Sequence, residues 1–119
     1  MLIQESLIRG NIDVAVLHLL QERDMYGYEI IQQIKMRSDG DFTVKFGSLY
    51  PVMYRMIERG MLTEETVLVG KRRIRKYYHL TDLGLEYLEN IRTEYLKISS
   101  GMNKILNYNG EESNSSEEK

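Results

Sequence analysis

Five of the six consecutive residues Lys71-Arg72-Arg73-Ile74-Arg75-Lys76 are positively charged. Such a cluster repels itself unless an anionic partner offsets the repulsion, so its expected chemistry is the binding of phosphates. The β-prone segments 63–69 and 75–80 flank the residues 70–73, which predicts a hairpin with the cations at its turn. A nuclear-localisation signal or a membrane-surface patch is the competing interpretation, although no amphipathic apolar face accompanies the cluster.

The charge distribution agrees with a single anion-binding surface. Residues 1–44 carry four Lys or Arg against seven Asp or Glu, residues 45–79 carry eight against three, and residues 80–119 carry four against eight. The formal net charge is −2, so only the middle of the chain is basic. A surface that meets phosphates would produce this pattern, and chance clustering on a solvated face would produce it equally well.

A second candidate group lies just before the cluster, on a predicted helix over residues 48–59. Ser48 is a favourable N-cap, Pro51 falls in the first turn, and Gly60 ends the helix. Apolar residues recur at helical spacing on one side: Leu49, Val52, Met53, Met56 and Ile57. The opposite side presents Pro51, Tyr54, Arg55 and Glu58. Arg55 can donate two hydrogen bonds to guanine, Tyr54 can reach a base or phosphate, and Ser48 with the first amides can hold a phosphate, although an ordinary solvated face remains the alternative.

Other chemistry finds little support in the composition. The chain has no cysteine, and its two histidines, His18 and His79, are far apart with no second ligand at metal-binding spacing. There is also no Gly-rich phosphate loop and no carboxylate pair in an apolar setting. We therefore expect no enzyme activity, no metal site and no cofactor.

The elements that must position the two groups follow from periodicity. Helices are predicted over about 11–22 and 26–38, with a turn at 38–40 and a short edge pairing at 42–44. The predicted hairpin follows the 48–59 helix, and Thr81-Asp82 caps a long last helix. The predicted fold is mainly α (α+β), a winged helix-turn-helix over residues 1–80, a dimerisation helix over 81–108 and a disordered acidic tail over 109–119.

The last helix carries an apolar seam at heptad spacing. Its members are Leu88, Ile91, Tyr95, Ile98, Met102 and Ile105. We predict that this seam forms a homodimer interface, and packing back on the first helix of the same chain is the alternative. Without an apolar run near membrane length or a signal sequence, the expected location is the cytoplasm.

Three ordered motifs resemble the PadR family of bacterial transcriptional regulators. They are Tyr26-Gly27-Tyr28-Glu29-Ile30, Gly47-Ser48-Leu49-Tyr50-Pro51 with Arg55 to Leu62, and Arg75 to Gly84. The resemblance implies a homodimeric repressor that leaves its operator when a small molecule binds. It also implies double-stranded DNA contacts at Ser48, Tyr50, Pro51, Tyr54 and Arg55 and at Lys71, Arg72, Arg73, Arg75 and Lys76.

The short length is similar to a compact subfamily with a single C-terminal helix, some members of which bind flat aromatic drugs at the dimer interface. Tyr95 occupies a position similar to that of an aromatic residue flanking the drug. The expected effector pocket comprises Ile8, Ile12, Ala15, Tyr95 and Ile98. A second hypothesis is a winged-helix module that binds a protein partner and has no sequence-specific affinity for DNA.

Overall fold

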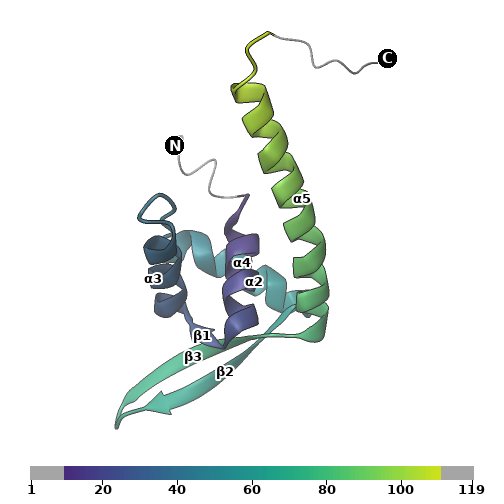
Figure 1. Ribbon diagram of the computed structural model, residues 1–119. Coiled ribbons are helices and arrows are strands. Elements are labelled where there is room, and N and C mark those ends of the chain that lie inside the picture. Colours follow the sequence, from purple (N-terminus) through teal and green to yellow (C-terminus); the bar gives the residue numbers. More distant parts are fainter. Residues whose placement is uncertain (1–9, 111–119) are drawn as a thin grey trace.

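The computed structural model of the chain describes residues 10–110. The elements, in chain order, are α2 (Ile12–Glu22), β1 (Met25–Tyr26), α3 (Gly27–Arg37), α4 (Phe46–Glu58), β2 (Leu62–Val69), β3 (Arg73–Leu80) and α5 (Asp82–Leu106). In Figure 1 the β2–β3 hairpin projects from one end of the helices, and α5 leads away from them in another direction. This arrangement confirms the predicted winged helix-turn-helix. The predicted tail lies, from residue 111 onward, outside the described residues.

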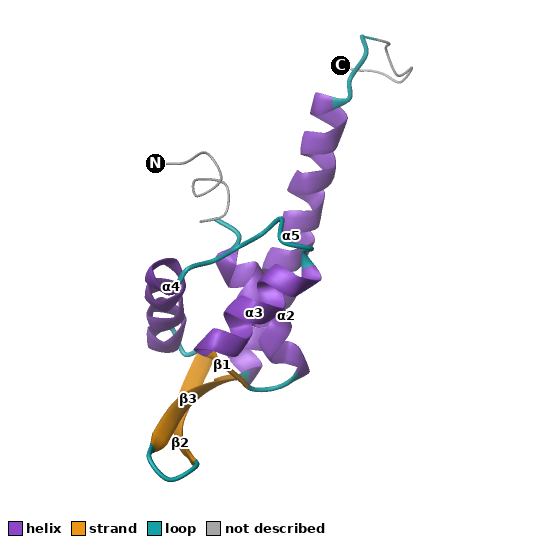
Figure 2. Cartoon of the chain, turned by 90° about the vertical axis from the view of Figure 1, so that its left-hand side faces the viewer, coloured by secondary structure: helices purple, strands orange, loops and turns teal. Residues whose placement is uncertain are grey.

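The hydrophobic core lies where α2, α3 and α4 meet the root of the sheet. Its buried residues have the three- and four-residue spacing that the sequence predicted for the helices: Ile12, Val16, Leu17, Leu19 and Leu20 on α2, Ile30 and Ile34 on α3, and Leu49, Val52, Met53 and Met56 on α4. The sheet adds Leu62 and Tyr78. Figure 2 shows the helices gathered together, with the strands extending beyond them. The core therefore fixes α4 and the root of the hairpin as one unit.

The sheet has three strands in the order β1-β3-β2, and both pairings are antiparallel. Met25 lies opposite Tyr78 and Tyr26 opposite Tyr77, so β1 occupies the free edge of β3. The edge pairing predicted at 42–44 is wrong, because those residues form no strand. Val44 is instead buried in the core, and the Phe42 amide donates to Ser38 Oγ at 2.9 Å.

The beginning of α4 also differs from the prediction. The helix begins at Phe46 after an extended Lys45, and no side chain caps it, so Ser48 lies inside the helix and is not its N-cap. Pro51 is consequently in the second turn, where its ring nitrogen cannot donate to the Gly47 carbonyl four residues earlier. The predicted end is confirmed, since Gly60 follows the C-cap residue with a φ of 79°.

The base of α5 is bound to the segment that follows α4. Thr81 caps α5 as predicted, its Oγ1 accepting from the Gly84 amide at 3.0 Å and donating to the Gly60 carbonyl at 2.7 Å. The Thr81 amide donates to the Met61 carbonyl at 3.1 Å. Leu88, one helical turn after Gly84, is buried in the same core. The first turns of α5 are therefore part of the winged-helix body, whereas the later turns extend beyond it (Figure 1).

Candidate nucleic-acid interface

The exposed side of α4 carries four of the five residues expected on that helix. Ser48, Pro51, Tyr54 and Arg55 are exposed. On the opposite side, Leu49, Val52, Met53 and Met56 are buried as predicted, and Ile57 is partly buried. Tyr54 is 55% exposed although it is large and aromatic. Within residues 10–110, no carboxylate forms an ion pair with the Arg55 guanidinium. The helix thus offers a phenol and a guanidinium to an outside partner.

Tyr50 has a structural task as well. Its ring stacks on Phe46, with ring centroids 5.5 Å apart, and lies 6.3 Å from the Tyr54 ring. A Cβ on Gly27 would come within 2.7 Å of the Tyr50 hydroxyl oxygen, so any larger residue at the start of α3 would have to displace the Tyr50 ring. The Tyr26-Gly27-Tyr28 motif therefore allows the start of α3 to lie directly against the aromatic row of α4.

An open hollow of about 400 Å³ lies between the exposed side of α4 and the hairpin. Its lining combines aromatic side chains with two cations: Tyr26, Tyr28, Phe46, Tyr50, Tyr54, Tyr78, Arg75 and Lys76, together with Gly27 and Ile74. Burial raises the pKa of Tyr78 to about 12, so its phenol remains neutral at physiological pH. The hollow joins the exposed side of α4 to the hairpin in one concave surface.

The five cations of the cluster are not equivalent. Lys76 Nζ lies 3.5 Å from Glu64 Oε1, and the Arg75 guanidinium stacks over the Tyr26 ring at 4.2 Å. Lys71, Arg72 and Arg73, at the tip of the hairpin, have no acidic partner within the described residues. Charges that are already paired or stacked contribute less to the attraction of a new anion, so these three tip cations are the principal phosphate-binding candidates.

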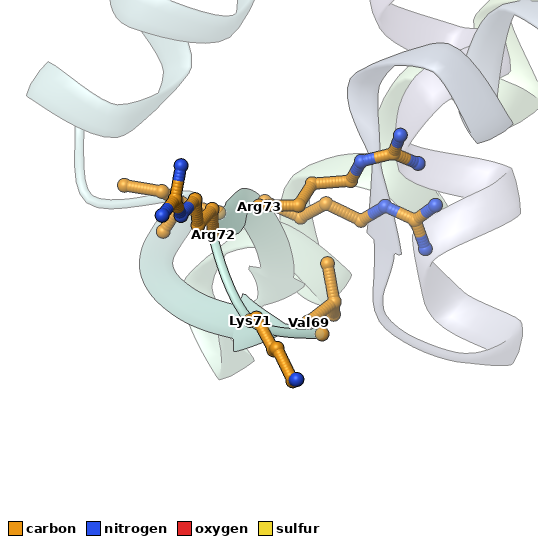
Figure 3. Close-up of a pocket in the computed structure, with 7 residues that line it drawn as sticks. Val69, Lys71, Arg72 and Arg73 are labelled. Atoms are coloured by element: carbon orange, nitrogen blue, oxygen red, sulfur yellow. The ribbon is translucent and has the colours of Figure 1, made fainter.

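Figure 3 shows how the three tip cations are distributed around an open hollow of about 830 Å³. The Arg72 and Arg73 side chains leave the turn in opposite directions, and Lys71 points away from the body. Gly70, whose φ of 74° lies in the left-handed region, helps to reverse the chain between the strands. The tip therefore presents positive charge on both sides of the ribbon.

Several residues of this surface were not among the predicted site residues. Tyr26, Tyr28 and Phe46 line the hollow, and Leu68 and Ile74 are exposed near the tip. The aromatic residues belong to, or directly precede, two of the motifs that carried the family resemblance. The exposed aliphatic pair has no local sequence signal, because alternation alone does not reveal which face of a hairpin is left uncovered.

The model of the transcriptional regulator PadR-like family matches residues 16–90. The chain belongs to the PadR-like family of transcriptional regulators. Protein X of Lysinibacillus sphaericus is 34% identical over 97 residues, covering 82% of this chain and 89% of that protein. A solved transcriptional regulator from Clostridium thermocellum is 30% identical, covers 83% of this chain and 96% of its own, and superposes with a TM-score of 0.76.

The negative transcriptional regulator PadR of Bacillus subtilis is 29% identical over 76 residues. The match covers 64% of this chain but only 42% of that protein. This PadR-like protein is therefore a winged-helix, DNA-binding transcriptional regulator, and the concave surface of α4 and the hairpin is its candidate DNA interface. None of the helices within residues 10–110 is both long and apolar enough to cross a membrane.

The predicted effector residues of this PadR-like regulator are distributed unevenly. Ala15 and Tyr95 line an open hollow of about 280 Å³ between α2 and α5. Its other lining residues are Asn11, Val14, His18, Phe42, Arg92 and Leu96. Ile12 is only 1% exposed and faces the core, Ile98 is exposed beyond the hollow, and Ile8 lies outside the described residues.

The predicted dimer seam divides into a buried and an exposed part. Leu88 is buried within its own chain and Ile91 packs against the core, so both stabilise the base of α5. Tyr95, Ile98, Met102 and Ile105 are all exposed and continue the seam along the projecting turns. The part of the seam that a second copy can reach therefore begins at Tyr95.

Proposed function

We propose that this PadR-like regulator is a homodimeric repressor that binds operator DNA through α4 and the hairpin and releases it when a small aromatic effector binds. The observation that carries the DNA-binding part is the concave surface on which exposed Tyr54 and Arg55 lie beside a hairpin whose three tip cations have no acidic partner within residues 10–110. A helix in the major groove and a hairpin on the adjacent backbone fit this surface.

In this assignment the two halves of the surface have different tasks. Arg55 donates to guanine acceptors, and Tyr54 contacts a base or phosphate from the same side of α4. Ser48, Tyr50 and Pro51 lie nearest the backbone, while Lys71, Arg72 and Arg73 bind phosphates and set the register. Arg75 and Lys76 contribute less to phosphate binding, because Tyr26 and Glu64 already contact them.

The homodimer is supported by the projecting turns of α5. An isolated helix that exposes an apolar seam along its length is stabilised by a second, equivalent helix. Two-fold symmetry would then place two α4 helices on half-sites about one helical turn, roughly 34 Å, apart. The repressor role is supported by the similarity to the Bacillus subtilis protein, which is named a negative regulator.

Removing two tip cations tests DNA binding directly. In the Arg72→Ala/Arg73→Ala variant we expect affinity for the DNA upstream of its own gene to fall, with the slope of log affinity against log salt reduced by about 0.9 for each lost phosphate contact. Titrations at several salt concentrations measure both. The control, Lys35→Ala/Lys104→Ala, removes two exposed cations elsewhere and is expected to keep the wild-type slope. Equal slopes for the two variants, or equal affinity for upstream and scrambled DNA in the wild type, would reject the proposal.

The effector hollow is tested by substituting its aromatic residue. A Tyr95→Ala variant is expected to bind planar aromatic ligands about tenfold more weakly, because a ring contact against the ligand is lost. Since the chain has no tryptophan, the quenching of tyrosine emission can be followed directly. Tyr108→Ala removes an exposed tyrosine far along the chain and serves as the control. Unchanged ligand affinity in Tyr95→Ala would remove the effector from this hollow.

A further inference from the structure

Two aliphatic side chains are exposed side by side near the tip of the hairpin. Leu68 on β2 lies directly opposite Ile74 on β3. Their exposed fractions are 66% and 63%, so neither is covered by another part of the described chain. Paired aliphatic residues on a projecting ribbon cost free energy in water, which calls for a partner that covers them.

The exposed aliphatic side chains lie on one face of the hairpin only. Residues that face each other across an antiparallel pair lie on the same side of the sheet, and neighbours along a strand alternate. Val67, opposite Arg75, and Val69, opposite Arg73, therefore share the other face, and both are partly buried. The Leu68–Ile74 face is the one that, at the root of the hairpin, carries the buried residues Leu62 and Tyr78.

The surroundings of the pair select its partner. Lys71, Arg72 and Arg73 lie within a few residues of Leu68 and Ile74 and have no acidic partner within the described part of the chain. The partner must therefore combine apolar surface with dense negative charge. The minor groove of DNA has this character, since its walls are deoxyribose carbons and its rims are phosphates.

The position of Ile74 joins the pair to the candidate DNA surface. Ile74 lines the same hollow as Tyr54 and Tyr50 of α4, and it also lines the tip hollow of Figure 3. DNA that is held by α4 thus lies next to the aliphatic face of the hairpin. A minor groove flanks every major groove, so the same duplex can meet both elements.

We propose that Leu68 and Ile74 form an apolar wedge that enters the minor groove beside the α4 site and opens it, so that the operator flanks are selected for easily deformed steps. The inference rests on the proposed DNA-binding function and adds a specificity determinant to it. The physical basis is width: the groove is about 6 Å wide, whereas two paired strands are already about 4.8 Å apart before their side chains are counted.

Opening the groove costs free energy that depends on the bases being deformed. Pyrimidine–purine steps such as TA and CA unstack readily, whereas A-tracts are stiff and keep a narrow groove. Aliphatic side chains that insert between base pairs bend the duplex away from the minor groove. The wedge therefore selects sequence without a hydrogen bond to any base.

The test compares the duplexes that three proteins select from a random pool: the wild type, Leu68→Thr/Ile74→Thr, and the control Val67→Thr. Threonine retains a high strand propensity while it removes most of the apolar surface, and Val67 lies on the opposite face of the same hairpin. We expect the wild type and control to enrich a pyrimidine–purine step beside the α4-contacted bases. Replacing that step with an A-tract should weaken their binding about tenfold.

The double variant is expected to select the same central bases with no flank preference. The ratio of its affinities for the duplex with the pyrimidine–purine step and the duplex with the A-tract should be near one. Fluorescence energy transfer between the ends of the duplex should report a smaller bend in the double variant than in the control. Equal flank preference and equal bending in the double variant and wild type overturn the wedge while leaving the proposed function intact. Loss of self-association in the double variant with an unchanged flank preference assigns the pair to contacts between copies and also overturns it. A wild-type pool with no enriched sequence contradicts the proposed function itself.

Discussion

Replacing Ile98 and Met102 with aspartate is expected to convert the protein into a monomer that binds the operator roughly 10²- to 10⁴-fold more weakly, because the two half-sites are no longer held by one linked molecule. Both side chains are exposed on the projecting turns of α5. In the proposed dimer each aspartate would place an unpaired carboxylate in an apolar interface, which strongly favours separation. Sedimentation measures the oligomeric state, and titration of duplexes with one or two half-sites measures the affinity.

The control for this variant is Thr93→Asp/Ser100→Asp, which adds the same two charges to exposed positions on the other side of α5. It is expected to remain a dimer with an affinity close to that of the wild type. The proposed interface would be wrong if Ile98→Asp/Met102→Asp sedimented as the wild type does. Separation of both variants into monomers would show a general effect of charge on α5.

The Gly84→Ala variant is expected to lose about 3 kcal/mol of unfolding free energy, because the added methyl group overlaps backbone that cannot move away. A Cβ at this position would overlap the Met61 carbonyl oxygen, which also accepts the Thr81 amide, and it would press on Leu80. Thermal unfolding followed by circular dichroism should register a fall in Tm of roughly 10–20 °C.

Gly47→Ala is the matched control, since Gly47 is also helical but has no atom within 4 Å of an added Cβ. This substitution is expected to change stability by less than about 1 kcal/mol, in the stabilising direction, because alanine is the better helix former. A Gly84→Ala protein as stable as Gly47→Ala would contradict the tight contact between α5 and Met61.

The helices were predictable because their signal is local. The apolar spacing of α4 placed Leu49, Val52, Met53 and Met56 in the core, and the glycine after it marked its end. The start of α4 was misplaced because Ser48 has the side chain of a good N-cap, yet the chain is already helical at Phe46. Packing of Phe46 on Tyr50 accompanies this earlier start, and the capping preference of a single residue does not by itself decide where a helix begins.

The pairing of β1 and the contacts of the hairpin cations depend on residues distant in sequence. β1 consists of two residues, too few for a pattern. It forms because β3 offers a free edge far along the chain, where Met25 lies opposite Tyr78, 53 residues later. Likewise, nothing near Arg75 or Lys76 in the sequence indicates that Tyr26 and Glu64 contact them. The five cations look equivalent in the sequence. In the structure, three of them lie at the tip of the hairpin without an acidic partner among the described residues, and the other two already contact Tyr26 and Glu64.

The hydrogen bonds at the base of α5 have a mechanical consequence. Thr81 and Gly84 hold the first turn of α5 against Gly60 and Met61, which come just after the C-cap residue of α4. Because these contacts fix its base, α5 would act as a lever about 37 Å long whose pivot lies at the end of the helix proposed to face DNA. In the proposed dimer, two α5 helices would cross each other. A small change in their crossing angle would then change the separation and tilt of the two α4 helices.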